Sequence, residues 1–133
     1  MPHILIVEDE PTMSWALAEG LSDDGFTIDT FRCAEDAWSW LQRGRSDLVI
    51  ADLKLPGMSG LDLARKLQRG PHAQPVIIVT AYGTPEVMTE MQTLGVSDCF
   101  PKPFPIDTLR RSVRRALEGA DPTKGSHKRG GAA

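Results

Sequence analysis

The sequence predicts an α/β protein in which a parallel sheet lies between two layers of helices. Short apolar runs alternate five times with segments of helical periodicity along the 133 residues. Continuous apolar runs are typical of strands that are covered on both faces, as in parallel sheets. Parallel strands joined through helices have right-handed crossovers, and this places helices on both faces. The expected architecture is a three-layer, doubly wound (βα)5 sandwich.

The strands are expected where the apolar runs occur. Three purely aliphatic runs, at residues 4–7, 48–51 and 76–79, predict the central strands. Two further segments, at residues 26–31 and 96–100, mix polar and apolar side chains. A strand at the edge of a sheet is less protected than a central one, so these two segments are predicted to form the edges.

Between the strands, apolar residues recur with the i, i+3, i+4, i+7 spacing of a helix that lies with one face on a sheet. The segments are residues 13–21, 34–41, 63–67, 87–94 and 106–117. Pro11 and Pro85 suit the first turns of two of these helices. Residues 119–133 are rich in glycine and have no large apolar side chain, so we expect one domain at 1–118 followed by a flexible tail or linker.

Composition and charge exclude several classes of protein. The net charge of −3 argues against direct binding of nucleic acid by this domain. Apolar runs of about four residues are too short to cross a bilayer, and the first residues do not resemble a secretory signal. Cys33 and Cys99 lie outside any metal-binding or disulfide spacing. We therefore expect a cytoplasmic protein that binds no membrane.

Polar residues follow the predicted strands at the ends where α/β sheets bind their ligands. They are Glu8, Asp9 and Glu10 after the first strand, then Asp52, Thr80 and Lys102 after the third, fourth and fifth. Close carboxylates repel one another unless a cation lies among them, and hard oxygen ligands favour Mg²⁺. Beside Mg²⁺, Asp52 is a plausible nucleophile toward phosphorus. Thr80 and Lys102 could contact the phosphoryl oxygens.

Four segments together resemble the receiver domain of two-component response regulators, and the resemblance covers residues 3–118. The segments are LIVEDEP at 5–11, DLKLPGMSG at 52–60, TAY at 80–82 and KPF at 102–104. The resemblance implies a flavodoxin-like fold with the strand order 2-1-3-4-5. It also implies a signalling switch that assists its own phosphorylation and dephosphorylation and is not otherwise an enzyme.

The resemblance assigns a role to each site residue. Asp52 would accept a phosphoryl group from a sensor histidine kinase or a phosphotransfer protein. Glu8, Asp9, Asp52 and the backbone carbonyl of Lys54 would hold Mg²⁺, while Thr80 and Lys102 would contact the phosphoryl group. The surface formed by the fourth helix, fifth strand and fifth helix would pass the change to an effector domain or protein. A dimer through that surface is left open.

Three residues affect how far the fifth strand is expected to rearrange and how fast the phosphoryl group is expected to be lost. Most receivers have an aromatic residue three positions before the lysine, where this chain has Cys99, so we predict a muted rearrangement of the fifth strand. Lys54 and Tyr82 occupy the positions that flank the path of the hydrolytic water. Both are bulky, and neither is a carboxylate or amide that would position water. We predict slow self-dephosphorylation, over minutes or longer.

Three other functions compete with this interpretation. Aspartate-nucleophile phosphatases normally have a second aspartate two residues after the nucleophile, where this chain has Lys54. A flavin or nucleotide carrier would need a phosphate loop after the first strand, where this chain has carboxylates. A phosphorylation-independent interaction module of the same fold would have a damaged acidic pocket, and no pocket position is lost here.

Overall fold

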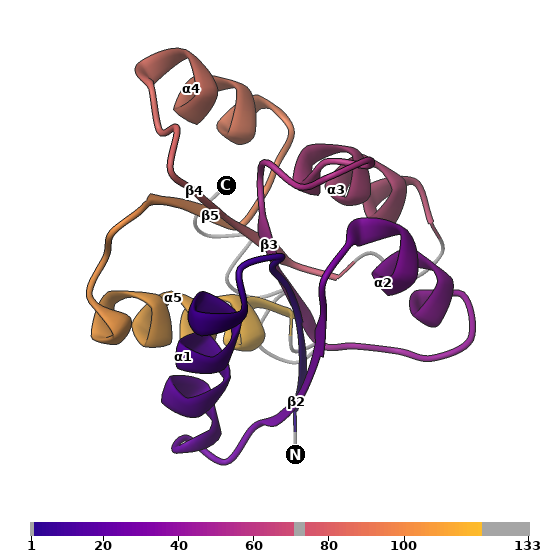
Figure 1. Cartoon of the computed structure of the whole chain (residues 1–133), viewed down its shortest axis with the longest axis vertical. Helices are drawn as coiled ribbons and strands as arrows, with labels where there is room; N and C mark the ends of the chain where they lie inside the picture. Colours follow the sequence, from indigo (N-terminus) through magenta and orange to yellow (C-terminus); the bar gives the residue numbers. More distant parts are fainter. Residues whose placement is uncertain (1, 71–73, 121–133) are drawn as a thin grey trace.

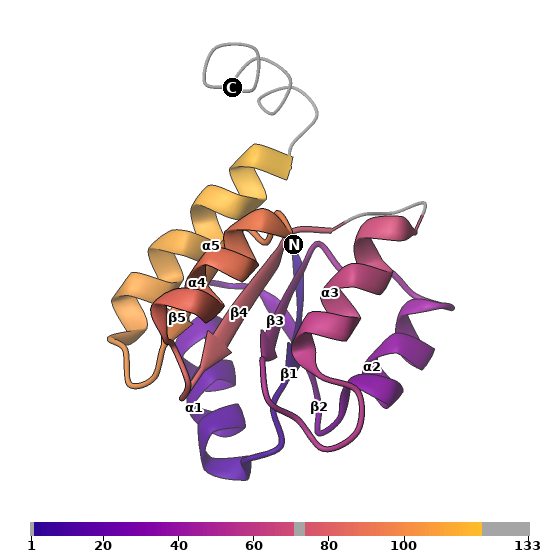
Figure 2. The same cartoon turned by 90° about the horizontal axis from the view of Figure 1, so that it is seen from above.

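The structure is a computed structural model that describes residues 2–70 and 74–120. Its strands, drawn in Figure 1, form one parallel sheet in the order β2-β1-β3-β4-β5, which the labels of Figure 2 show. In chain order the elements are β1 (His3–Val7), α1 (Pro11–Ser22), β2 (Thr27–Phe31), α2 (Ala34–Leu41), β3 (Leu48–Asp52), α3 (Gly60–Arg69), β4 (Val76–Thr80), α4 (Pro85–Thr93), β5 (Asp98–Pro101) and α5 (Ile106–Ala120). The predicted fold class and strand order are confirmed.

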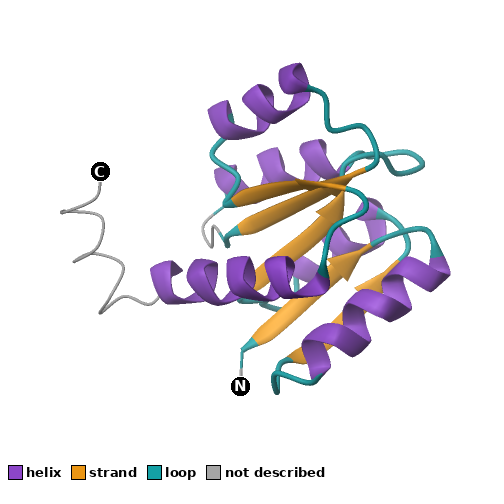
Figure 3. Ribbon diagram, turned by 90° about the vertical axis from the view of Figure 1, so that its left-hand side faces the viewer, coloured by secondary structure: helices purple, strands orange, loops and turns teal. Residues whose placement is uncertain are grey.

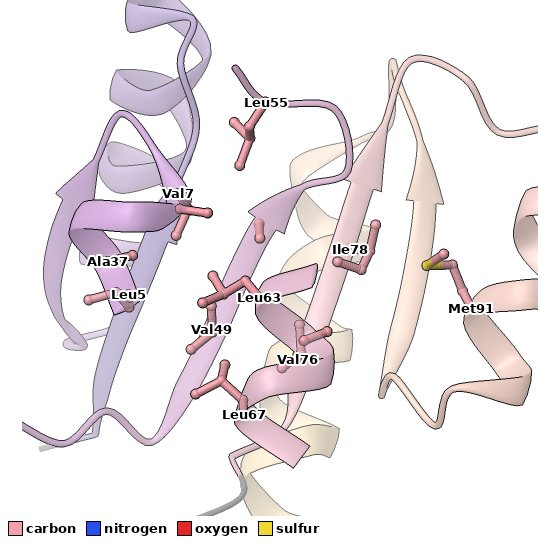
Figure 4. Packing of buried hydrophobic residues seen from close by; sticks show 13 residues of the cluster. Leu5, Val7, Ala37, Val49, Leu55, Leu63, Leu67, Val76, Ile78 and Met91 are labelled. Atoms are coloured by element: carbon pink, nitrogen blue, oxygen red, sulfur yellow. The ribbon is translucent and has the colours of Figure 1, made fainter. Parts of the chain in front are cut away.

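Helices cover both faces of the sheet, and each face has its own apolar cluster. The helices α1 and α5 lie together on one face, and α2 and α3 lie on the other (Figures 2 and 3). Because successive residues of a strand point to opposite faces, Leu5 packs toward α2 and α3 while Ile4 packs toward α1 and α5. Figure 4 shows the first cluster, in which Leu63 of α3 and Met91 of α4 pack with residues from the strands.

The central and edge strands are those that the hydrophobic pattern predicts. Every residue of β3 and of β4 is buried, whereas every residue of β2 and of β5 is partly or fully exposed. The strands β3 and β4 each extend one residue past their apolar run and so end at Asp52 and Thr80. Two polar side chains therefore stand at the last positions of the central strands, at the same edge of the sheet.

The helices begin with the local signals that the sequence contains. Pro11 and Pro85 are the first residues of α1 and α4. The Glu10 side chain caps α1 by accepting hydrogen bonds from the N–H groups of Thr12 and Met13 at 3.0 and 2.9 Å. In α3, Ser59 and Asp62 form a reciprocal capping box, which satisfies two donors that the first turn leaves free.

The C-terminal helix is longer than the sequence pattern indicates. The helix α5 continues to Ala120, two residues beyond the expected boundary at 118. The remainder of the predicted tail, residues 121–133, lies outside the described residues. Within the described part of the chain, no helix has the length and apolar character needed to cross a membrane.

Candidate functional site

Three carboxylates converge at the carboxyl edge of the sheet. Glu8 and Asp9 directly follow β1, and Asp52 ends the neighbouring strand β3. One carboxylate oxygen from each of the three residues lies within 4.8 Å of the others. Glu8 and Asp52 are almost buried, with 2 % and 7 % of their surface exposed, and Asp9 is half-buried. The structure therefore brings together acidic residues that are more than forty positions apart in the chain.

Lys102 reaches into this acidic cluster from the segment after β5. Its Nζ donates hydrogen bonds to Glu8 Oε1 at 2.9 Å and to Asp52 Oδ2 at 2.8 Å. Its side chain is 17 % exposed, so solvent screens these ion pairs only weakly. One ammonium group faces three carboxylates, which leaves the cluster with an excess of negative charge. The Lys102–Pro103 peptide bond is cis.

The pKa values of Glu8 and Lys102 reflect burial and pairing together. Burial and, to a lesser extent, the charge of Asp52 raise the pKa of Glu8, and together they outweigh the lowering by the hydrogen bonds from Lys102 and the Glu10 N–H and by the charge of Lys102. Burial alone would lower the pKa of Lys102. The hydrogen bonds and charges of Asp52 and Glu8 outweigh that effect, so the pKa of Lys102 is raised and the ammonium form is stabilised.

Backbone groups hold the Asp52 carboxylate in place. Its second oxygen, Oδ1, accepts a hydrogen bond from the Lys54 N–H at 3.1 Å. The next residue, Leu53, continues the sheet ladder by donating its N–H to the Val79 carbonyl at 2.8 Å. Asp52 is thus fixed on both sides, while a small part of its surface remains accessible from solvent. A rigid, accessible carboxylate beside an ammonium group is suited to nucleophilic chemistry.

Thr80 connects the end of β4 to two neighbouring loops. The residue is fully buried, and its Oγ1 accepts a hydrogen bond from the Tyr82 N–H at 2.9 Å. Its carbonyl oxygen accepts a hydrogen bond from the Lys102 N–H at 2.7 Å. Among the described residues, the Thr80 hydroxyl therefore bonds to its own loop, while the Thr80 backbone is joined to that of Lys102.

Lys54 and Tyr82 meet beside the acidic cluster. The Lys54 Nζ lies 5.0 Å from the centroid of the Tyr82 ring, within the range of a cation–π contact. Tyr82 is 58 % exposed, and its ring borders an open apolar hollow with Leu53, Leu55 and Leu61. The two residues predicted to flank the path of the hydrolytic water are therefore in contact with each other. They join the loops that follow β3 and β4.

Cys99 lies in β5 at the edge of the sheet and is half-buried. With Met88 and Met91 of α4, it lines a cavity of about 150 Å³ between α4 and β5. Burial raises the pKa of the Cys99 thiol, and the charge of Asp98 raises it further. The thiol form is therefore favoured over the reactive thiolate.

Glu35 is a residue near the site that the sequence did not reveal. It belongs to the first turn of α2, yet its Oε2 accepts a hydrogen bond at 2.8 Å from the N–H of Met58, in the loop between β3 and α3. An acidic residue is common in the first turn of a helix, because its negative charge interacts favourably with the positive end of the helix dipole. Nothing in its local sequence indicates that it contacts the segment that follows Asp52.

The residues present fit a hard divalent cation. Glu8, Asp9 and Asp52 offer carboxylate oxygens from a compact cluster that has excess negative charge, with no imidazole or thiolate among the clustered ligand groups. Such a ligand set suits Mg²⁺, which prefers oxygen ligands and retains some of its water.

Comparison with known proteins gives the class to which this fold and site correspond. The chain belongs to the family of response regulator receiver domains, whose profile matches residues 4–114. Receiver domains of this family are signalling switches in two-component systems. The expectation drawn from the four sequence segments is confirmed.

Individual relatives agree with this assignment. The chain is 36 % identical over 124 residues to the phosphate regulon transcriptional regulatory protein PhoB of Rhizobium meliloti, with 92 % of this chain and 55 % of PhoB covered. It is 35 % identical to sporulation initiation phosphotransferase F of Bacillus subtilis, with 86 % of this chain and 92 % of the relative covered. The chain thus spans about half the length of PhoB and nearly all of the phosphotransferase.

Solved structures show the same architecture. The signal receiver domain of a putative Luxo repressor protein from Vibrio parahaemolyticus superimposes with a TM-score of 0.85 at 31 % identity, covering 90 % of this chain and 92 % of that domain. Response regulator TrrA from Thermotoga maritima, solved in complex with Mg²⁺-BeF, has a TM-score of 0.79 at 32 % identity, with 87 % and 99 % covered.

Proposed function

We propose that this protein is a phosphoryl-accepting switch and that Asp52 is its acceptor. A carboxylate oxygen of Asp52 attacks the phosphorus of a phosphohistidine on a sensor histidine kinase or a phosphotransfer protein. The new O–P bond forms as the P–N bond breaks, and the histidine nitrogen keeps the electron pair of that bond. The observation that carries this proposal is the placement of Asp52. It is partly accessible at the end of β3, 2.8 Å from the Lys102 ammonium and clustered with Glu8 and Asp9.

Mg²⁺ is the cofactor that this site would use. Glu8, Asp9, Asp52 and the backbone carbonyl of Lys54 would hold the ion. When bound, it would supply positive charge that offsets the repulsion between the carboxylates and the incoming phosphoryl oxygens. The solved complex of TrrA with Mg²⁺-BeF supports this assignment, since that protein is 32 % identical to this chain.

Thr80 and Lys102 would recognise the phosphoryl group. Lys102 already contacts Asp52, so its ammonium is placed to pair with a phosphoryl oxygen. The Thr80 hydroxyl would leave the Tyr82 N–H and donate to another phosphoryl oxygen. The 2.7 Å hydrogen bond between the Lys102 N–H and the Thr80 carbonyl would couple the two movements.

The output surface would be formed by α4, β5 and α5. Movement of Thr80 and its loop shifts the population of two arrangements of this surface, which changes its affinity for an effector domain or protein. Because Cys99 replaces the usual aromatic residue, the side-chain rearrangement on β5 would be muted. A dimer through the same face is consistent with the proposal. Residues 1–118 would act as the receiver and 119–133 as a tail or the start of a linker, with the first two of them completing α5, in a cytoplasmic protein.

The lifetime of the phosphorylated state would be long. The contact between Lys54 and Tyr82 supports the prediction of slow self-dephosphorylation, because it holds together two bulky side chains from the loops that follow Asp52 and Thr80. Loss of the phosphoryl group in Mg²⁺ alone is expected to take minutes or longer, and to quicken in Tyr82→Ala. A half-life of seconds in the native protein would contradict the prediction.

The direct test is intact-protein mass spectrometry after incubation with Mg²⁺ and acetyl phosphate. The native protein is expected to gain the mass of one phosphoryl group, and Asp52→Asn is expected to gain none. Omission of Mg²⁺ should abolish the gain as well. If the native protein gains no mass, it is a phosphorylation-independent interaction module. Steady release of phosphate with many turnovers would instead indicate an aspartate-nucleophile phosphatase.

A further inference from the structure

We propose that Glu35 is a positioning residue for phosphorylation, which anchors the loop between β3 and α3 and so sets the geometry around Asp52. This inference rests on the proposed function of Asp52 as the phosphoryl acceptor. Glu35 itself lies on another element, in the first turn of α2, and would touch neither the phosphoryl group nor the cation. Its effect would pass through the backbone of residues 53–59.

The contact between Glu35 and the loop is specific. Glu35 Oε2 accepts a hydrogen bond from the Met58 N–H at 2.8 Å. The carboxylate also packs against Gly57, whose φ is +76°, and a Cβ added to Gly57 would overlap Glu35 Oε2 and lie 3.1 Å from its carboxyl carbon. The side chain and the turn therefore fit each other closely on the outer side of the loop.

The electrostatic state of Glu35 agrees with this fit. The hydrogen bond from the Met58 N–H lowers the pKa of Glu35, and its own backbone N–H lowers it further. The Glu35 side chain is therefore ionised near neutral pH, and it accepts the hydrogen bond as a carboxylate. Hydrogen bonds from N–H groups to a carboxylate are shorter and stronger than those between neutral groups.

Among the described residues, the other attachments of the loop lie at its ends and on its inner side. The Gly60 N–H donates to the Leu53 carbonyl at 3.0 Å, which closes the neck of the loop. The Leu55 side chain is buried in the core on the inner side, as Figure 4 shows. Glu35 contributes the outer contact, at Met58.

The other end of the same loop, at Lys54, contacts the proposed acceptor Asp52 directly. The Lys54 N–H donates to Asp52 Oδ1 at 3.1 Å, and the carbonyl of the same residue is the one proposed to hold Mg²⁺. Without the hydrogen bond at Met58, the middle of the loop is held by the apolar packing of Leu55 and Met58, which is less directional, so the backbone at Lys54 beside Leu55 gains freedom. Catalysis is sensitive to such changes, since small displacements of reacting groups reduce rates strongly. Glu35 would therefore raise the rate of phosphorylation by limiting the positions of Lys54.

The experiment compares Glu35→Ala, Glu35→Gln and the control Asp36→Ala in the full chain. Asp36 is the next residue of α2 and is also exposed. Its replacement by alanine changes the net charge by the same amount as Glu35→Ala. Two quantities are measured: the initial rate of phosphorylation by acetyl phosphate, and the Mg²⁺ concentration that gives half of the maximal rate. Thermal unfolding of each variant shows that it is folded at the assay temperature.

Glu35→Ala is expected to lower the rate about threefold to tenfold, the loss that corresponds to one hydrogen bond of ordinary net strength. It should also raise the Mg²⁺ requirement. Glu35→Gln keeps an oxygen acceptor but loses the negative charge, so its rate should lie between those of Glu35→Ala and the native protein. Asp36→Ala should match the native protein. Should Glu35→Ala unfold, Glu35→Asp provides the same test, because it keeps the charge and shortens the reach.

Each contrary result has a separate meaning. If Glu35→Ala and the native protein react alike, the loop does not need this anchor and the inference fails. Equal losses in Glu35→Ala and Asp36→Ala would assign the effect to net charge and would also overturn it. Equal losses of rate in Glu35→Ala and Glu35→Gln would also overturn the inference. Glutamine keeps an oxygen that can accept the hydrogen bond, so the loss would not come from a missing acceptor. If the native protein takes no phosphoryl group at all, the proposed function itself fails.

Discussion

Replacement of Gly60 by alanine tests how tightly α3 is joined to the strand that carries Asp52. Gly60 is the first residue of α3 and is buried against the end of β3. A Cβ at this position would overlap the carbonyl oxygen of Asp52. It would also lie 2.9 Å from the Asp52 carbonyl carbon and 3.2 Å from the Leu53 Cα. These are backbone atoms, so no flexible side chain can move aside to make room.

The size of the effect follows from two opposing contributions. Overpacking a tightly packed position costs about 1–3 kcal/mol. The better helix propensity of alanine returns at most about 1 kcal/mol. The free energy of unfolding of Gly60→Ala should therefore fall by about 1–2 kcal/mol, which corresponds to a melting temperature lower by roughly 3–10 °C for a chain of this size. Because the backbone of Asp52 must shift, the rate of phosphorylation should fall as well.

The assay combines thermal unfolding with phosphorylation by acetyl phosphate. Gly119→Ala is a matched control, because Gly119 lies in α5 and a Cβ there would meet no atom within 4 Å. The control should be as stable as the native protein or more stable by less than about 0.5–1 kcal/mol, the gain for glycine to alanine in the middle of a helix, because Gly119 is the last but one residue of α5. If Gly60→Ala has native stability and a native rate, the close approach of α3 to Asp52 does not constrain the site.

Three further predictions follow from other parts of the structure. Leu63→Ala empties a fully buried position in the core and should lower the free energy of unfolding in urea by about 3–5 kcal/mol; a loss below about 1 kcal/mol would show that the site is not tightly packed. The hydrogen bond from Arg110 lowers the pKa of Asp24 below its ordinary value of 3.8. The stabilisation that ionised Asp24 gives the folded protein is therefore complete above pH 3.8 and is lost as the pH falls through the folded-state pKa. The difference in urea midpoint between the native protein and Asp24→Asn should therefore be largest near neutral pH and shrink under acidic conditions, and a constant difference would refute the linkage. Asp9→Ala removes one member of the acidic cluster and should raise the Mg²⁺ concentration needed for half-maximal phosphorylation about tenfold, whereas an unchanged requirement would exclude Asp9 as a ligand.

Local sequence patterns predicted the framework of this protein well, because each pattern reports on a property of its own segment. An aliphatic run such as residues 76–79 must be covered on both faces, wherever the covering helices come from in the chain. Proline at position 11 or 85 favours the start of a helix through its own restricted backbone and missing N–H. The parallel arrangement then gathers the residues that follow the strands at one edge of the sheet.

Sequence patterns were less informative about the ends of elements and about loops. The strands β3 and β4 include Asp52 and Thr80, which the apolar pattern alone does not assign to a strand. Helix α5 continues past residue 117, the last position of the predicted apolar pattern, to Ala120. In both cases backbone hydrogen bonding extends the element further than side-chain hydrophobicity indicates.

The amino-acid sequence by itself determined the fold class, the central and edge strands, and the set of polar residues that meet at one edge of the sheet. Only the tertiary structure decided how these residues are paired: Lys102 with Glu8 and Asp52, the Thr80 hydroxyl with the Tyr82 N–H, and Glu35 with the loop after β3. The physical reason is distance along the chain. Lys102 is 94 residues from Glu8 and 50 from Asp52, and such contacts depend on how separate loops are packed rather than on any local periodicity.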